Sequence, residues 1–138
     1  MSAYLIDTNV ISELVKPAPD PRVVGFLTRE ADLWLSALTL HELAFGAARV
    51  ADPQRRQRLT SWLDAIQSRF RGRWIEVDEA IAEFAGRSRG LAASRGRNVT
   101  PLDSLIAATA QKRSLTLATR NLRDFDALEV ATFDPWSG

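Results

Sequence analysis

The pattern of apolar and polar positions predicts short strands that alternate with amphipathic helices along the whole chain. Between the apolar runs, hydrophobic residues recur every three or four positions, which is the spacing of one helix face. Alternating strands and helices are typical of a parallel sheet covered on both faces. We therefore predict an α/β fold: one three-layer α/β/α domain, residues 1–138, with a central parallel sheet of four to five strands. The expected strands are Ala3–Ile6, Leu33–Ala37, Trp74–Val77, Thr116–Thr119 and Glu129–Phe133.

Prolines and small polar residues indicate where the helices begin. A proline at the first helical position, or a Ser, Thr, Asp or Asn just before it, is typical of a helix start. In the helix that starts at Pro21, we expect Val23, Val24, Phe26 and Leu27 to face inward. The other expected helices run from Asn9 to Lys16, from Thr39 to Val50, and onward from Pro53, Asp78 and Thr100.

Four acidic residues follow strands at the positions where this architecture binds ligands. In open parallel sheets, ligands bind beyond the carboxyl ends of the strands. Each acid, taken alone, is explained equally well by helix capping, since Thr39-x-x-Glu42 and Thr100-x-x-Asp103 have the form of capping boxes. Asp7 could cap the first helix by itself, and Asn121-x-x-Asp124 is a looser version of the box. The acids are Asp7, Glu42, Asp103 and Asp124.

Taken together, the four carboxylates predict a metal site. Like charges brought close together repel one another and raise one another's pKa, and a bound divalent cation removes that penalty. Ligation by oxygen alone favours the hard cations Mg²⁺ or Mn²⁺. Such ions polarise phosphoryl oxygens and activate water for attack. The sequence therefore predicts metal-dependent phosphodiester chemistry.

Composition restricts the chemistry further. The sequence of 138 residues has no cysteine, which excludes disulfides, thiolate-bound zinc and a cysteine nucleophile. Its single histidine, His41, makes a Ser-His-Asp triad an unattractive alternative. The net charge is only +1, but 16 of the 18 basic residues are arginines, which favour bidentate contacts with phosphate. This excess fits a polyanionic partner, and it fits an arginine-rich surface that reflects genomic base composition equally well.

No targeting or membrane segment is expected. Asp7 interrupts the first apolar run before a signal peptide could form. No apolar stretch is long enough to span a bilayer. We expect a cytoplasmic protein without a membrane partner.

Four motifs follow one another along the chain, and they are Asp7-Thr8-Asn9, Thr39-x-x-Glu42, Thr100-x-x-Asp103 and Thr119-Arg120-Asn121-x-x-Asp124-Phe125. In their order and spacing, these motifs resemble those of PIN-domain nucleases. The likeness is greatest to the VapC-type toxins of bacterial toxin–antitoxin pairs, in particular the FitB-like branch, and it covers nearly the whole chain. The fold it implies is PIN-like.

The resemblance implies roles for individual residues. Asp7, Glu42, Asp103 and Asp124 would bind one or two Mg²⁺ or Mn²⁺ ions. Thr119 and Asn121 would orient the metal shell or its waters, and Asn9 would support Asp7. Asp126 lies close enough to Asp124 to replace or assist it. At the end of the chain, Asp134 stands where relatives often have Asn, which we do not expect to affect the chemistry.

The resemblance also implies an activity and partners. Members of the family are metal-dependent ribonucleases that usually form homodimers and are silenced by a small cognate antitoxin. They would meet DNA only indirectly, through the antitoxin. Arg95, Arg97 and Arg120 are candidates for contact with the RNA substrate. Two alternatives are open: a mainly binding role in an antitoxin complex that represses its own operon, and a housekeeping or DNA-directed nuclease of the same fold.

Overall fold

The computed structural model describes residues 2–137 and has the predicted order of alternating strands and helices. The strands are β1 (Tyr4–Ile6), β2 (Leu33–Ser36), β3 (Trp74–Ile75), β4 (Thr116–Ala118) and β5 (Thr132–Phe133). The α-helices are α1 (Thr8–Ser12), α2 (Pro21–Arg29), α3 (Ala37–Ala48), α4 (Pro53–Arg69), α5 (Glu79–Ser94), α6 (Pro101–Lys112) and α7 (Leu122–Phe125). Short 3-10 helices follow α1 and α7, namely η1 (Glu13–Val15) and η2 (Asp126–Leu128).

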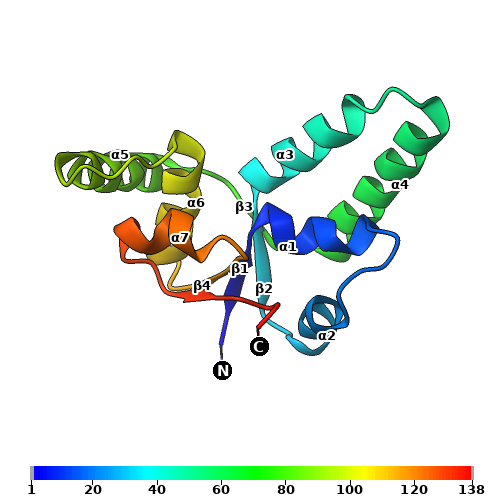
Figure 1. Ribbon diagram of the computed structural model, residues 1–138, viewed down its shortest axis with the longest axis horizontal. Coiled ribbons are helices and arrows are strands. Elements are labelled where there is room, and N and C mark those ends of the chain that lie inside the picture. The colour runs from blue at the N-terminus through cyan, green and yellow to red at the C-terminus, as the bar shows by residue number, and fades with distance from the viewer. Residues whose placement is uncertain (1, 138) are drawn as a thin grey trace.

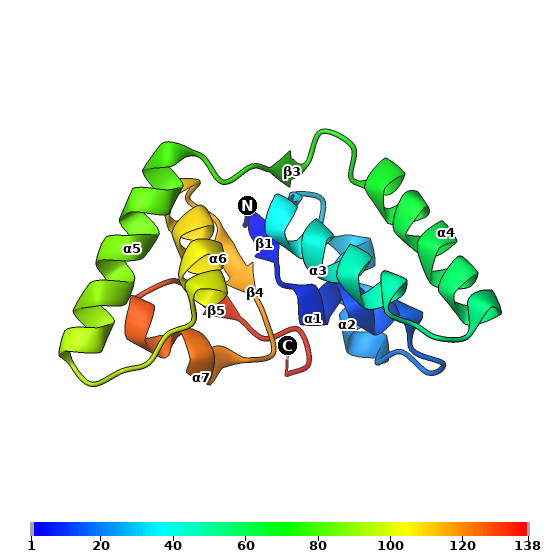
Figure 2. The ribbon, with the colours of Figure 1, turned by 90° about the horizontal axis from the view of Figure 1, so that it is seen from above.

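The strands form one five-stranded sheet in the order β3-β2-β1-β4-β5, and every neighbouring pair is parallel. This confirms the predicted parallel sheet. Strands β1 and β4 are therefore neighbours although most of the chain separates them in sequence, as Figure 2 shows. The residues that follow β1 and β4 are brought to the same edge of the sheet.

Each face of the sheet carries its own hydrophobic core. Successive residues of a strand point to opposite faces, so Ile6 belongs to one core and Leu5 to the other. Figure 1 shows α1 to α4 on one side of the sheet and α5 to α7 on the other. This is the three-layer α/β/α arrangement that the sequence predicts.

Several predicted details are wrong. Helix α3 begins at Ala37, because Ser36 is its N-cap and accepts a hydrogen bond from the Leu38 N–H at 3.0 Å. Thr39 therefore lies inside the helix and does not cap it. Val24 is predicted to face inward but is 36% exposed, because Val23, Phe26 and Leu27 form the buried face of α2 and Val24 lies at the margin of that face. The strands β3 and β5 are also shorter than the apolar runs that predict them.

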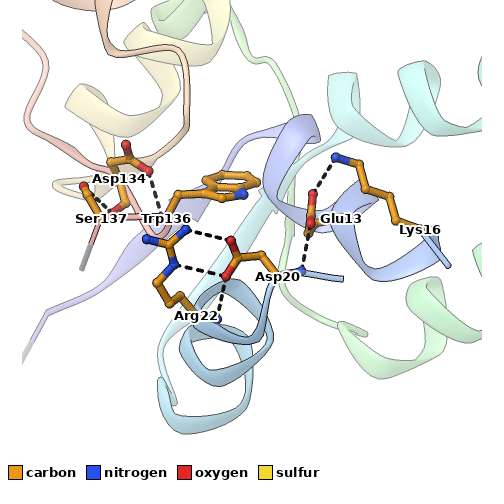
Figure 3. A network of polar contacts seen from close by, with 7 residues as sticks. All are labelled: Glu13, Lys16, Asp20, Arg22, Asp134, Trp136 and Ser137. Atoms are coloured by element: carbon orange, nitrogen blue, oxygen red, sulfur yellow. Dashed lines mark hydrogen bonds and ion pairs between the residues drawn. The ribbon is translucent and has the colours of Figure 1, made fainter. Parts of the chain in front are cut away.

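The segment between α1 and α2 is held by a buried carboxylate rather than by further helix. Glu13 is only 4% exposed, accepts the Asp20 N–H at 2.9 Å and pairs with Lys16 at 2.8 Å (Figure 3). Because both ends of the proline-rich loop meet at this carboxylate, the start of α2 is fixed against η1.

No helix among the described residues is both long enough and apolar enough to cross a membrane.

Candidate active site

Asp7 lies where β1 ends and α1 begins. Its backbone N–H donates to the carbonyl oxygen of Ala118 at 2.9 Å, which continues the pairing of β1 with β4. Its Oδ1 accepts the Thr8 N–H at 2.9 Å, so the side chain does cap α1. Capping occupies one oxygen and leaves Oδ2 to face the neighbouring strand.

Thr119 at the end of β4 fixes the second oxygen of Asp7. Its hydroxyl is fully buried, donates to Asp7 Oδ2 at 2.8 Å and accepts the Asn121 N–H at 3.1 Å. Asn9 Nδ2 lies 3.4 Å from Asp7 Oδ2 and 3.4 Å from Thr119 Oγ1. The Asp7 carboxylate therefore accepts hydrogen bonds from three groups: the Thr8 N–H, the Asn9 side chain and the Thr119 hydroxyl. Asn121 takes part here through its backbone rather than its side chain.

The charges of three predicted acids act on one another. Burial raises the pKa of Asp7, and the negative charge of Asp124 adds to that rise, while hydrogen bonds from Thr119, Thr8 and Asn9 oppose it. Burial also raises the pKa of Asp103, and the charges of Asp124 and Asp7 raise it further. The structure therefore brings Asp7, the N-cap of α1, into one electrostatic group with Asp103 on α6 and Asp124 on α7.

The local sequence around Asp103 folds as predicted. Thr100 is the N-cap of α6 and accepts the Asp103 N–H at 3.1 Å, with Pro101 at the first helical position. The corresponding box at α7 does not form, because Asn121 makes no side-chain cap bond there. Asp124 lies in the first turn of α7 and is exposed, and among the described residues it makes no capping-box bond with Asn121.

Glu42 is placed differently from the prediction. Because Ser36 rather than Thr39 is the N-cap of α3, Glu42 lies in the second turn of the helix rather than the first. It is half-buried, and it is not among the charges that raise the pKa of Asp7 or of Asp103. Thr39, three residues before it and on the same side of the helix, meets the Thr8 hydroxyl at 3.4 Å. That contact directs this side of α3 towards α1, and no pattern in the sequence indicated it.

The donor set suits a hard, hydrated cation. Within residues 2–137, no three Asp, Glu or His side chains lie close enough to form a compact metal-binding cluster. Mg²⁺, however, usually keeps several of its waters and needs only one or two direct carboxylates. Carboxylates that raise one another's pKa are stabilised in their ionised form by a nearby cation. The side chains therefore fit a hard divalent cation because they offer oxygen ligands and a shared negative charge.

The candidate arginines have different environments. Arg97 forms an ion pair with Asp126, and both are exposed. Asp126 is therefore paired with a residue of the loop between α5 and α6. Its charge does not contribute to the raised pKa of Asp7 or Asp103. Arg95 is exposed at the end of α5. Arg120 donates its backbone N–H to Asn9 Oδ1 at 3.3 Å, and its guanidinium lies over the ring of Trp136.

Known proteins match this chain over nearly its whole length. The family model described as "PIN domain" matches residues 4–131, and the chain belongs to this family. Toxin FitB of Neisseria gonorrhoeae is 40% identical over 135 residues, covering 96% of this chain and 97% of that protein.

Two further comparisons agree. A tRNA(fMet)-specific endonuclease VapC of Shigella flexneri is 29% identical over 137 residues, covering 99% of this chain and 100% of that protein. Among solved structures, FitAB bound to a DNA fragment matches with a TM-score of 0.90 and 38% identity, covering 96% of this chain and 95% of that one. The predicted PIN-like fold and the resemblance to VapC- and FitB-type toxins are confirmed.

Proposed function

We propose that this chain is an endoribonuclease that depends on Mg²⁺ or Mn²⁺ and acts as the toxin of a toxin–antitoxin pair, with residues 1–138 as a single nuclease domain. The observation that carries the proposal is the Asp7 carboxylate, which Thr119 and Asn9 hold at the edge of the sheet, where burial and the charges of Asp124 and Asp7 raise the pKa of Asp103. Membership of the PIN-domain family and similarity to a VapC endonuclease support it.

The residues have separate roles in the proposed reaction. Asp7, Asp103, Asp124 and Glu42 would hold the divalent cation. When bound, that cation supplies charge neutralisation at the phosphodiester and activates water for attack. Thr119 and Asn9 keep Asp7 Oδ2 in one orientation, because each places a donor against that oxygen. The backbone N–H of Asn121 bonds to the Thr119 hydroxyl in turn. The Asn121 side chain would orient the metal shell or its waters.

The proposed partners are a small cognate antitoxin, RNA and a second copy of the chain. Similarity to toxin FitB and to a FitAB complex on DNA supports an antitoxin partner and DNA contact through that partner. A reaction on cellular RNA would take place in the cytoplasm. The DNA-bound relative also favours the alternative of a mainly repressive binding role, which predicts a complex without RNA cleavage.

The test is cleavage of total RNA by the isolated chain with Mg²⁺, with Mn²⁺ and with EDTA, followed by mapping of the cut sites. We expect cleavage with either cation and none with EDTA. Parallel assays on tRNA, single-stranded RNA and DNA separate a ribonuclease from a DNA-directed enzyme. Cleavage that persists in EDTA, or an absence of cleavage under every condition, would contradict the proposal.

Thr119→Val is expected to slow RNA cleavage by about 10–100-fold while leaving the fold intact, as loss of a group that orients a metal ligand typically does. The methyl group fills the same buried space but cannot donate to Asp7 Oδ2. Initial rates at saturating cation measure the effect. Thr109→Val is the matched control, because Thr109 is equally buried but its hydroxyl donates to the Leu105 carbonyl within α6, away from Asp7. Equal rates for the two variants would contradict the role of Thr119.

A further inference from the structure

The backbone of Arg120 is joined to the residues that hold Asp7. It follows Thr119, and its backbone N–H bonds to Asn9, which itself contacts Asp7. Among the described residues 2–137, the Arg120 guanidinium takes part in no ion pair and no side-chain hydrogen bond. Its central carbon lies 4.9 Å from the centroid of the Trp136 ring. A guanidinium stacked on an aromatic face keeps the N–H groups at its edge available for another acceptor.

Trp136 is a fixed platform for this stacking. The residue is only 6% exposed and packs into the core that includes β1, α1 and α2. Its backbone N–H donates to Asp134 Oδ1 at 2.8 Å, in the group of polar contacts that Figure 3 shows. The Thr119 N–H bonds to the Phe133 carbonyl at 2.9 Å, so the chain end is joined to β4 immediately before Arg120. Asp134 therefore helps to fix the backbone of Trp136.

Asp20, an acid on which the charge of Arg120 acts, already has a partner. Both oxygens of Asp20 bond to Arg22, at 3.1 Å and 2.8 Å, as Figure 3 shows. Hydrogen bonds from Arg22 lower the pKa of Asp20 to about 2, and the charge of Arg120 adds a smaller lowering. Arg120 thus lies within electrostatic range of an ionised acid whose oxygens are taken by another guanidinium. The charge of Arg120 acts on Asp20 and does not contribute to the pKa of Asp7 or Asp103, so the guanidinium lies on the α2 side of the acidic group.

We propose that Trp136 is a positioning residue that holds the Arg120 guanidinium at the edge of the acidic site, where it binds a backbone phosphate of the RNA substrate. This inference rests on the proposed ribonuclease function and adds the specific contact. Stacking restricts the flexible arginine before RNA arrives, so less conformational freedom is lost on binding. A phosphate contact of this kind positions the strand without selecting its sequence.

The test measures binding of a fluorescent single-stranded RNA across a range of NaCl concentrations, in EDTA and on an Asp7→Asn background so that no cleavage interferes. Arg120→Gln is expected to raise Kd about tenfold, the loss of one charge-assisted hydrogen bond. The slope of log K against log salt should fall by about 0.7, the value for one phosphate on a single strand. Trp136→Met should produce both changes, and Trp136→Phe, which keeps an aromatic face, should produce much less.

The double variant Arg120→Gln/Trp136→Met distinguishes positioning from general structural support. If Trp136 acts through Arg120, the double variant binds RNA no more weakly than Arg120→Gln alone. The inference would be overturned if Trp136→Met weakened RNA binding as much in the Arg120→Gln background as it does when Arg120 is present. Unfolding temperatures establish that each variant is folded, and the Arg120→Gln comparison tests the phosphate contact even if Trp136→Met does not fold.

Arg113→Gln is the matched control for the loss of one positive charge. Arg113 is exposed and precedes β4, at the opposite end of the strands from the acidic site. RNA affinity and salt slope that are the same for Arg120→Gln and Arg113→Gln would overturn the inference. A wild-type chain that cleaves RNA while Arg120→Gln binds it unchanged contradicts this inference alone. A wild-type chain that never cleaves RNA contradicts the proposed function itself.

Discussion

Replacing Asp7 by asparagine is expected to lower cation-dependent RNA cleavage by about 10³-fold or more, which corresponds to several kcal/mol of lost transition-state stabilisation. Asp7 is the acid that hydrogen bonds from Thr8, Thr119 and Asn9 hold in place, so its position barely changes while its charge is lost. Initial rates on a single RNA substrate at saturating Mg²⁺ or Mn²⁺ measure the effect. A variant as active as the wild type would contradict the mechanism.

The same substitution should leave the fold stable. The folded-state pKa of Asp7 is raised, so the native state holds this proton more tightly than the unfolded chain does. Its contribution to stability therefore falls as pH rises from the ordinary pKa of 3.8 through the raised one, and stays low at neutral pH. Asparagine carries no charge, so it avoids the cost of burying an ionised carboxylate at neutral pH. In EDTA at neutral pH, the variant should unfold at the same temperature as the wild type or higher.

Divalent cations should affect the unfolding temperature of the wild type and of Asp7→Asn differently. A cation that binds only the native state raises the unfolding temperature of the wild type, and Asp7→Asn should lose that increase. Asp126→Asn is the matched control, since it makes the same chemical change on a carboxylate that is paired with Arg97. The control should keep both its cleavage rate and its cation-dependent stabilisation. If Asp126→Asn instead loses them, Asp126 replaces Asp124 or assists it.

Phe26→Ala is expected to lower the free energy of unfolding by about 3–5 kcal/mol. The ring is 1% exposed and packs edge-on against Tyr4, with 5.0 Å between centroids, and stacked on Phe133 at 5.3 Å. It therefore joins α2 to both β1 and β5. The loss is a large part of the roughly 5–15 kcal/mol that stabilises an ordinary domain. Urea unfolding followed by circular dichroism measures it.

Val24→Ala provides the control on the same helix. Val24 is 36% exposed, and substitutions at such positions usually change stability by less than about 0.5 kcal/mol. A comparable loss for both variants would show that the inward face of α2 has been assigned wrongly.

Much of the fold could be predicted because its determinants are local. Asp20, Asp52, Asp78 and Thr100 each cap a helix through an N–H at most three residues further on. Such a bond depends on a few neighbouring residues, and so it leaves a recognisable pattern. The start of α3 was predicted wrongly because two residues of capping type, Ser36 and Thr39, stand close together. Only the end of β2 decides which of them is used.

The sequence by itself determined the alternation of strands and helices, the position of each acid after a strand, and the choice of oxygen over sulfur or imidazole. Only the tertiary structure decided which groups meet. The Thr119–Asp7 hydrogen bond spans 112 positions, and the stacking of Arg120 on Trp136 joins β4 to the chain end. Both depend on the strand order that places β4 between β1 and β5. Periodicity fixes which face of a strand is buried, but it carries no information about which strand lies beside it.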